Sequence, residues 1–73
     1  MKVISTTDLS HYGNDCYINR SVTLAEQFGL YVVITFQKIT GWYEDRYVGV
    51  DYMRDNYDDA IKFYKENGGI LED

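Results

Sequence analysis

The sequence carries one histidine and one cysteine that are near enough in the chain to raise the question of covalent catalysis. His11 and Cys16 are five residues apart, and Asp8 or Asp15 could orient the imidazole. In such a dyad the histidine removes the thiol proton and the thiolate attacks the substrate. No oxyanion-hole element or flanking signature accompanies the pair. We therefore interpret His11 as a surface residue and Cys16 as a half-buried structural thiol, and a small thiol enzyme is the least favoured hypothesis.

The other residues that could do chemistry do not form a recognisable site either. A zinc site needs three or four Cys or His ligands, and this chain has two such residues in total. Gly68 and Gly69 follow a predicted helix, so they indicate a helix end and not a phosphate cradle. An acidic run lacks the central glycine and terminal glutamate of a calcium loop; it consists of Asp51, Asp55, Asp58 and Asp59. We expect a non-catalytic protein with no metal and no cofactor.

The composition indicates one small domain, residues 1–73, with an acidic surface. The chain is 45% hydrophobic and 16% aromatic, with eight tyrosines, which is too apolar for a disordered segment. Its net charge of −5 repels nucleic acid and anionic membranes and attracts basic partners. The same charge also serves solubility alone. We expect a protein partner, and neither direct nucleic-acid binding nor membrane binding.

The chain also shows no sign of export or of a membrane span. Cys16 has no second cysteine to pair with, whereas small secreted domains usually depend on disulfides. The first residues, Met1 to Ser5, lack the apolar core of a signal peptide. The apolar run Leu30 to Ile34 is far shorter than the ~20 residues that a spanning helix needs. These features predict a cytoplasmic location, in a bacterial host cell if the resemblance described below holds.

Residues 30–54 predict a β-hairpin. The segment from Leu30 to Ile39 is rich in β-branched and aromatic residues, and Glu44 to Arg54 alternates polar and apolar residues. Side chains on alternate positions share a face, so the apolar sets meet if three pairs form: Phe36 with Val48, Ile34 with Val50, and Val32 with Tyr52. This register leaves Gly41-Trp42-Tyr43 as the loop. A two-residue loop would turn Asp51 into the core.

Residues 56–67 predict the main helix. Tyr57, Ala60, Ile61 and Tyr64 recur at the spacing of one helix face. Asp55 or Asn56 can cap the first turn, and Asn67-Gly68-Gly69 ends the helix. Ile70-Leu71 then either forms a short edge strand or packs over the helix end.

The first 29 residues leave alternatives open. Val3-Ile4 fits a short strand, Thr7 or Asp8 could cap a single helical turn ending at Gly13, and Gly13-Asn14-Asp15 is a turn signal. Ser21 to Phe28 fits a two-turn helix, while Tyr17 to Leu24 fits a strand. We favour the strand, with a turn near Glu26.

Together these elements predict an α+β fold. We expect two layers, in which an antiparallel sheet of three or four strands carries one main C-terminal helix on one face. The helix is expected on the face formed by Val32, Ile34, Phe36, Val48 and Val50. The other face would then be open, with a high tyrosine content: Tyr31, Val33, Thr35, Gln37, Ile39, Tyr43, Asp45, Tyr47, Gly49 and Asp51.

Two surface features remain as candidates for binding, namely aromatic residues at the hairpin tip and acids along the hairpin and helix start. Trp and Tyr supply many interface hot spots, and acids on a rigid frame can imitate nucleic-acid phosphates. The predicted partner-binding residues are Trp42, Tyr43, Glu44, Asp45, Tyr47, Asp51, Asp55, Asp58 and Asp59.

In size, charge and the hairpin-then-helix layout of residues 30–67, the chain resembles the small acidic inhibitor proteins of the anti-CRISPR or anti-restriction type, which phages and mobile elements encode. The resemblance rests on no motif. It implies a stoichiometric inhibitor, a nucleic-acid mimic whose acids occupy a basic groove or subunit contact of a nuclease or other nucleic-acid-processing complex. The alternative is a homodimeric structural or assembly module that pairs through its open sheet face or an edge strand. The protein is accordingly expected as a monomer or a homodimer.

Overall fold

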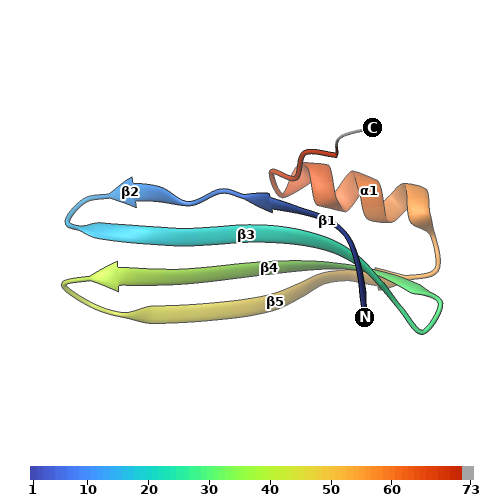
Figure 1. Ribbon diagram of the computed structural model, residues 1–73, viewed down its shortest axis with the longest axis horizontal. Coiled ribbons are helices and arrows are strands. Elements are labelled where there is room, and N and C mark those ends of the chain that lie inside the picture. The colour runs from blue at the N-terminus through green and yellow to red at the C-terminus, as the bar shows by residue number, and fades with distance from the viewer. Residues whose placement is uncertain (72–73) are drawn as a thin grey trace.

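A computed structural model describes residues 1–71 and shows an antiparallel sheet followed by one helix (Figure 1). The elements are β1 (Lys2–Asp8), β2 (His11–Gly13), β3 (Cys16–Gln27), β4 (Leu30–Gly41), β5 (Asp45–Arg54) and α1 (Tyr57–Glu66). The strand order is β1-β3-β4-β5, and β2 also pairs with β3. The predicted α+β class, with an antiparallel sheet and a C-terminal helix, is confirmed, but the sheet has five strands and not the expected three or four, because the N-terminal segment supplies both β1 and β2.

The N-terminal segment is extended and lacks the helical turn considered between Thr7 and Gly13. β1 and β2 pair with successive parts of the same β3 edge, and the last β1 pair joins Asp8 to Ser21. A local hydrogen bond lies at the break between the two strands: the Asp8 carboxylate accepts from the Ser10 amide at 2.9 Å. Pairing with the long β3 satisfies backbone groups that a single helical turn would leave unpaired.

The strand favoured for residues 17–24 is confirmed, and it is longer than predicted. β3 runs to Gln27 and turns through Phe28 and Gly29, whose φ angles are 53° and 75°. Positive φ at both central residues is the geometry of a type I′ hairpin turn, which matches the twist of the flanking strands. Phe28 is a costly residue for this position because its β-carbon resists the left-handed region.

The β4–β5 hairpin has the predicted pairs Phe36 with Val48 and Ile34 with Val50. The last pair of the hairpin is Ile39 with Asp45, so residues 40–44 connect the two strands and the connection is longer than the predicted three residues. The third predicted pair is wrong. A β-bulge at Asp51 shifts the register, so that Tyr52 pairs with Val33 and Met53 pairs with Val32.

The helix begins and ends close to the predicted residues. Asn56 is the N-cap, and its side-chain oxygen accepts a hydrogen bond from the Asp59 amide at 3.1 Å. Beyond Asn67, Gly68 has a φ of 94°, and the Gly69 amide donates to the Tyr64 carbonyl at 2.8 Å. This arrangement closes the free carbonyls of the last turn.

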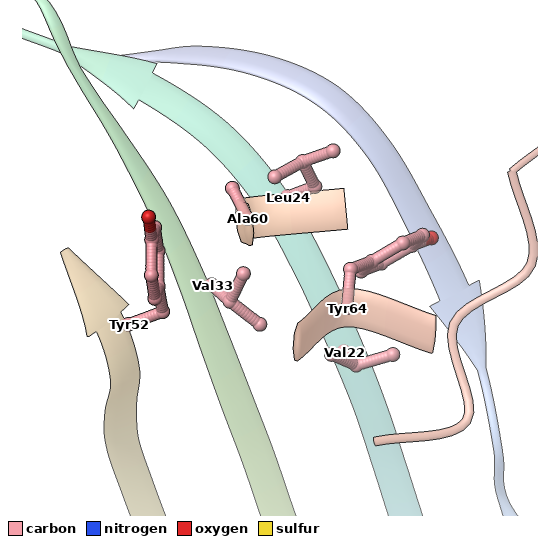
Figure 2. Close-up of a cluster of buried hydrophobic side chains, with 6 residues drawn as sticks. All are labelled: Val22, Leu24, Val33, Tyr52, Ala60 and Tyr64. Carbon is pink, nitrogen blue, oxygen red and sulfur yellow. The ribbon is translucent and has the colours of Figure 1, made fainter. Parts of the chain in front are cut away.

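The helix lies on the sheet face opposite to the expected one, because Ala60 and Tyr64 pack with Val22, Leu24 and Val33. Figure 2 shows the buried cluster that it forms with the sheet: Val22, Leu24, Val33, Tyr52, Ala60 and Tyr64. The bulge explains why the helix lies on this face, because it turns Tyr52 to the side of Val33 just before the chain enters the helix. The Tyr52 hydroxyl then donates to the Asn56 carbonyl at 3.1 Å and fixes the start of the helix on this side. We call this side the helix face.

The end of the described chain is tied to β1 by polar contacts and forms no edge strand. The Tyr64 hydroxyl lies 2.8 Å from the Ser5 hydroxyl and 2.6 Å from the Thr7 hydroxyl. The Ile70 amide donates to the Thr7 oxygen at 2.9 Å, and Leu71 packs against the buried cluster. Tyr64 is fully buried, so these hydroxyls supply the partners that its own hydroxyl needs.

Candidate functional site

The residues that we expected beneath the helix instead form an uncovered apolar surface on the other side of the sheet. Strand pairing places eight apolar side chains on that side, which we call the open face: Val3, Ala25, Val32, Ile34, Phe36, Val48, Val50 and Met53. In the part of the chain that the structure describes, the one helix packs on the opposite side, against Val22, Leu24 and Val33.

The open face is organised in rows of directly paired residues that cross all four strands. The first row is Val3, Ala25, Val32 and Met53; the second is Thr6, Thr23, Ile34 and Val50; the third is Asp8, Ser21, Phe36 and Val48. The Thr6 and Thr23 hydroxyls lie 3.2 Å apart, in keeping with their shared side. The apolar area is therefore widest on β4 and β5, while β1 and β3 contribute hydroxyl groups to the second row, and a carboxylate (Asp8) and a hydroxyl group (Ser21) to the third.

Four of these apolar side chains are more than half exposed. The exposed fractions are 55% for Val3 and Val48, 58% for Val50 and 53% for Met53. Ala25 and Val32, which lie between Val3 and Met53 in the first row, are buried. Scattered exposed apolar residues are ordinary, but a contiguous apolar patch on a soluble domain marks an interaction site.

Beyond the third row the open face becomes basic and then aromatic. Lys38 pairs directly with Arg46, and the Arg46 guanidinium lies 5.7 Å from the centre of the Phe36 ring. Farther along, the Tyr12 and Tyr17 rings pack with their centres 4.9 Å apart. Like charges opposite each other on a sheet repel and are destabilising, so an acidic group bound beside Lys38 and Arg46 would reduce this repulsion.

The nine predicted partner-binding residues are all exposed, but they do not gather in one place. Five lie at the hairpin tip or the adjoining part of β5: Trp42, Tyr43, Glu44, Asp45 and Tyr47. The Trp42 and Tyr43 rings are in edge contact at 4.3 Å. Asp51, Asp55, Asp58 and Asp59 lie at the other end of β5 and at the helix start. At about 3.3 Å per residue, roughly 36 Å of extended chain separates Glu44 from Asp55.

Two of the acids near the helix have local roles. Asp51 occupies the bulge and accepts a hydrogen bond from the Thr35 hydroxyl on the helix face. The Asp59 amide is held by the N-cap, and the Asp59 carboxylate lies near Tyr52. Burial, and secondarily the charge of Asp59, raises the pKa of the Tyr52 hydroxyl. Tyr52 therefore remains a neutral hydrogen-bond donor to the helix start.

His11 on β2 and Cys16 on β3 lie two pairs apart in the β2–β3 register and have separate neighbours. His11 pairs with Ile18, and its Nδ1 atom lies 3.1 Å from the Leu9 carbonyl. Cys16 pairs with Gly13 on one side and with Gly41 on the other, and its thiol is free. Within residues 1–71 no group of three or more potential metal ligands is present.

An acid on the rim of the open face is held ionised by its neighbour. Hydrogen bonds from the Ser10 hydroxyl and the Ser10 amide lower the pKa of Asp8. Asp8 and the pair Lys38 and Arg46 are thus charges at the border of an otherwise neutral surface.

Comparison with known proteins finds no relative of this chain. No protein-family model, curated protein or solved structure was found to match the chain. Among the described residues, no helix has the length and apolar character required to span a membrane.

Proposed function

We propose that this protein is a non-catalytic protein-binding module and that its binding surface is the open face. The observation that carries the proposal is the contiguous apolar surface of three rows, in which Val48, Val50 and Met53 are each more than half exposed. A chain of 73 residues buries only about 60% of the surface of its unfolded form. An uncovered apolar face therefore removes a large share of the hydrophobic stabilisation that so small a domain can gain. Covering that face with a partner recovers about 25 cal/mol for each Å² of apolar surface removed from water.

The proposal is tested by measuring whether the open face is covered under working conditions. Val50→Cys in a Cys16→Ser background puts a single thiol in the middle of the face. The matched control is Lys62→Cys in the same background, on an exposed helix position. We expect the thiol at position 50 to be alkylated more slowly than that at position 62 when the protein is concentrated or mixed with bacterial extract. Equal rates at every concentration and in the extract would show an uncovered face and contradict the proposal.

A second candidate function is stoichiometric inhibition of a nucleic-acid-processing complex through the acidic and aromatic residues of the hairpin tip and helix start. The exposure of all nine predicted residues favours it. The separation of Glu44 and Asp45 from the acids near the helix favours two small contacts over one continuous nucleic-acid mimic.

This second candidate is tested with surface variants that leave the buried cluster intact. Trp42→Ala, and charge reversal at Asp55 or Asp58, should each reduce inhibition of a CRISPR or restriction nuclease while circular dichroism shows that each variant remains folded. Glu66→Lys, at an exposed helix position outside the predicted set, is the control for the same change of charge. Full inhibition by all three variants, or none by the wild-type chain, would exclude this candidate.

A further inference from the structure

We propose that the partner on the open face is an amphipathic α-helix of another protein, with acidic side chains at the end that lies on Lys38 and Arg46. This inference rests on the proposed function, because it names the chemistry of the occupant of the same surface. Two observations carry it: the shape of the exposed apolar area, and the place of two bases at one end of that area.

The widest apolar part of the open face is a strip of two strands, β4 and β5. We call it the apolar strip, and it consists of six side chains: Val32, Ile34, Phe36, Val48, Val50 and Met53. Two neighbouring strands with their side chains are about 10 Å wide, and three rows, each two residues from the next, extend over about 13 Å. An α-helix is about 10 Å in diameter and rises about 1.5 Å per residue, so about three turns cover the strip. The strip therefore has the size of a single helix and is too small for a whole domain.

The borders of the apolar strip suit a helix that is apolar on one side only. In the second and third rows the β3 neighbours are polar, with Thr23 beside Ile34 and Ser21 beside Phe36. β5 is the last strand of the sheet, so its other side faces solvent. An amphipathic helix would bury its apolar side on the strip and keep its polar flanks against hydroxyl groups and water.

The opposite face of the same sheet shows that a single helix can cover such an area. There, α1 packs against Val22, Leu24 and Val33, and all three side chains are fully buried. On the apolar strip, Val48 and Val50 are 55% and 58% exposed. A partner helix would remove them from water in the same way, which is the favourable term of the association.

The bases at the end of the apolar strip determine the charge of the partner. Lys38 and Arg46 form the row directly after Phe36 and Val48, and both side chains are exposed. The protein as a whole has a net charge of −5, so a basic end on this face is a local reversal of sign. A carboxylate placed there accepts charge-assisted hydrogen bonds from both side chains and reduces the repulsion between them.

An acidic helix fits these charges better than a polyanion does. Nucleic acid and anionic membranes present many negative charges, and a net charge of −5 repels both. Asp8 lies on the open face in the row of Phe36. The Ser10 hydrogen bonds lower the pKa of Asp8, so its carboxylate stays ionised and opposes negative charge spread across the sheet. The basic pair therefore favours a partner whose acids are confined to one end.

The experiment measures the binding of labelled helical peptides to the full chain by fluorescence anisotropy. Each peptide has about 14 residues and a lactam bridge on its outer side, because short free helices are unstable in water. The acidic peptide has leucines at helix spacing and glutamates in its last turn, and the basic peptide has lysines in place of the glutamates. A scrambled peptide keeps the acidic composition without the apolar stripe. We expect the acidic peptide to bind about threefold to tenfold more tightly than the basic one, and the scrambled peptide not to bind.

Variants of the chain test the two parts of the site separately. The double variant Lys38→Glu and Arg46→Glu should reverse the preference, so that the basic peptide binds more tightly than the acidic one. The matched control is Lys62→Glu with Lys65→Glu, which makes the same change of charge at exposed positions of α1 and should leave the preference unchanged.

The apolar contact is tested with Val50→Thr, which should weaken the binding of the acidic peptide about fivefold. Ile70→Thr, an equally small change at an exposed apolar residue away from the open face, should not weaken it. Circular dichroism shows whether each variant is folded. Equal binding of the acidic and basic peptides, a preference that survives the double variant, or binding unaffected by Val50→Thr would each overturn the inference. Binding of oligothymidine or of phosphatidylserine vesicles in place of the acidic peptide would also overturn it.

The alkylation experiment distinguishes failure of this inference from failure of the proposed function. Protection of the thiol at position 50 by the acidic peptide supports the inference. Protection in bacterial extract, or in the concentrated pure protein, without binding of the acidic peptide would overturn the acidic helix and leave the binding function standing. A thiol that is never protected would overturn both.

Discussion

The two faces of this sheet differ less in composition than in what lies on them. On the helix face, Val22, Leu24 and Val33 are fully buried under Ala60 and Tyr64. On the open face, Val48 and Val50 carry the same kind of side chain and remain more than half exposed. A single ten-residue helix about 15 Å long covers one end of one face of a molecule that is 41 Å long. The fold therefore completes one core and leaves a second apolar layer available for association.

The largest expected effect on stability comes from truncating one apolar side chain to alanine on each of the two faces and comparing the free energies of unfolding. Leu24→Ala removes a fully buried side chain and should reduce the free energy of unfolding by about 2–5 kcal/mol. Val48→Ala, at 55% exposure on the open face, should change it by only about 0.5 kcal/mol in dilute monomer. Urea denaturation at low protein concentration measures both. Similar losses in the two variants would show that the open face is part of the monomer core.

A smaller loss is expected from the polar contacts that hold the helix face closed. Tyr64→Phe keeps the ring but removes the hydroxyl that meets Ser5 and Thr7, at a cost of about 1–3 kcal/mol. The control is Tyr12→Phe, because Tyr12 is 85% exposed and should tolerate the change. Thermal unfolding of the two variants provides the comparison. If Tyr64→Phe is as stable as Tyr12→Phe, the buried hydroxyl does not hold β1 and the chain end together.

A gain in stability is expected at the turn where β3 meets β4, away from the contacts of either face. Phe28→Asn places a residue that tolerates positive φ beside Gly29, and it should stabilise the chain by about 1 kcal/mol. Phe28→Ala is the matched variant, because it removes the exposed ring but keeps a β-carbon that resists this conformation. Chemical denaturation should separate them, and an equal gain in both would mean that the ring and not the backbone causes the strain.

The smallest effect is a pH dependence at the rim of the open face. The Ser10 hydrogen bonds lower the pKa of Asp8 in the folded chain, so the folded state favours the ionised carboxylate. This contribution is complete above the unfolded pKa of about 3.9 and is lost as the pH falls through the lower folded value. The stability difference between the wild type and Asp8→Asn should therefore shrink as denaturation is repeated at decreasing pH. A difference that stays constant down to the lowest pH would show that the carboxylate charge is not responsible.

The sequence by itself determined the elements with a strong local signal. Alternation and β-branched residues predicted the hairpin and two of its pairs, Phe36 with Val48 and Ile34 with Val50. The spacing of Ala60 and Tyr64, with Asn56 before them and Gly68 after, predicted the helix within a residue or two. These features depend on neighbours in the chain, where side-chain periodicity and capping are decisive.

Only the tertiary structure decided which face the helix covers. The run from Tyr31 to Phe36 is apolar at most positions, so alternation there does not distinguish a buried face from an open one. The decision was made by the bulge at Asp51, which turns Tyr52 toward Val33, and by the distant contacts of Tyr64 with Ser5 and Thr7. A bulge inserts one residue without a distinct local signature and reverses every side chain beyond it. The candidate site was hidden for the same reason, because its residues have the composition of a core.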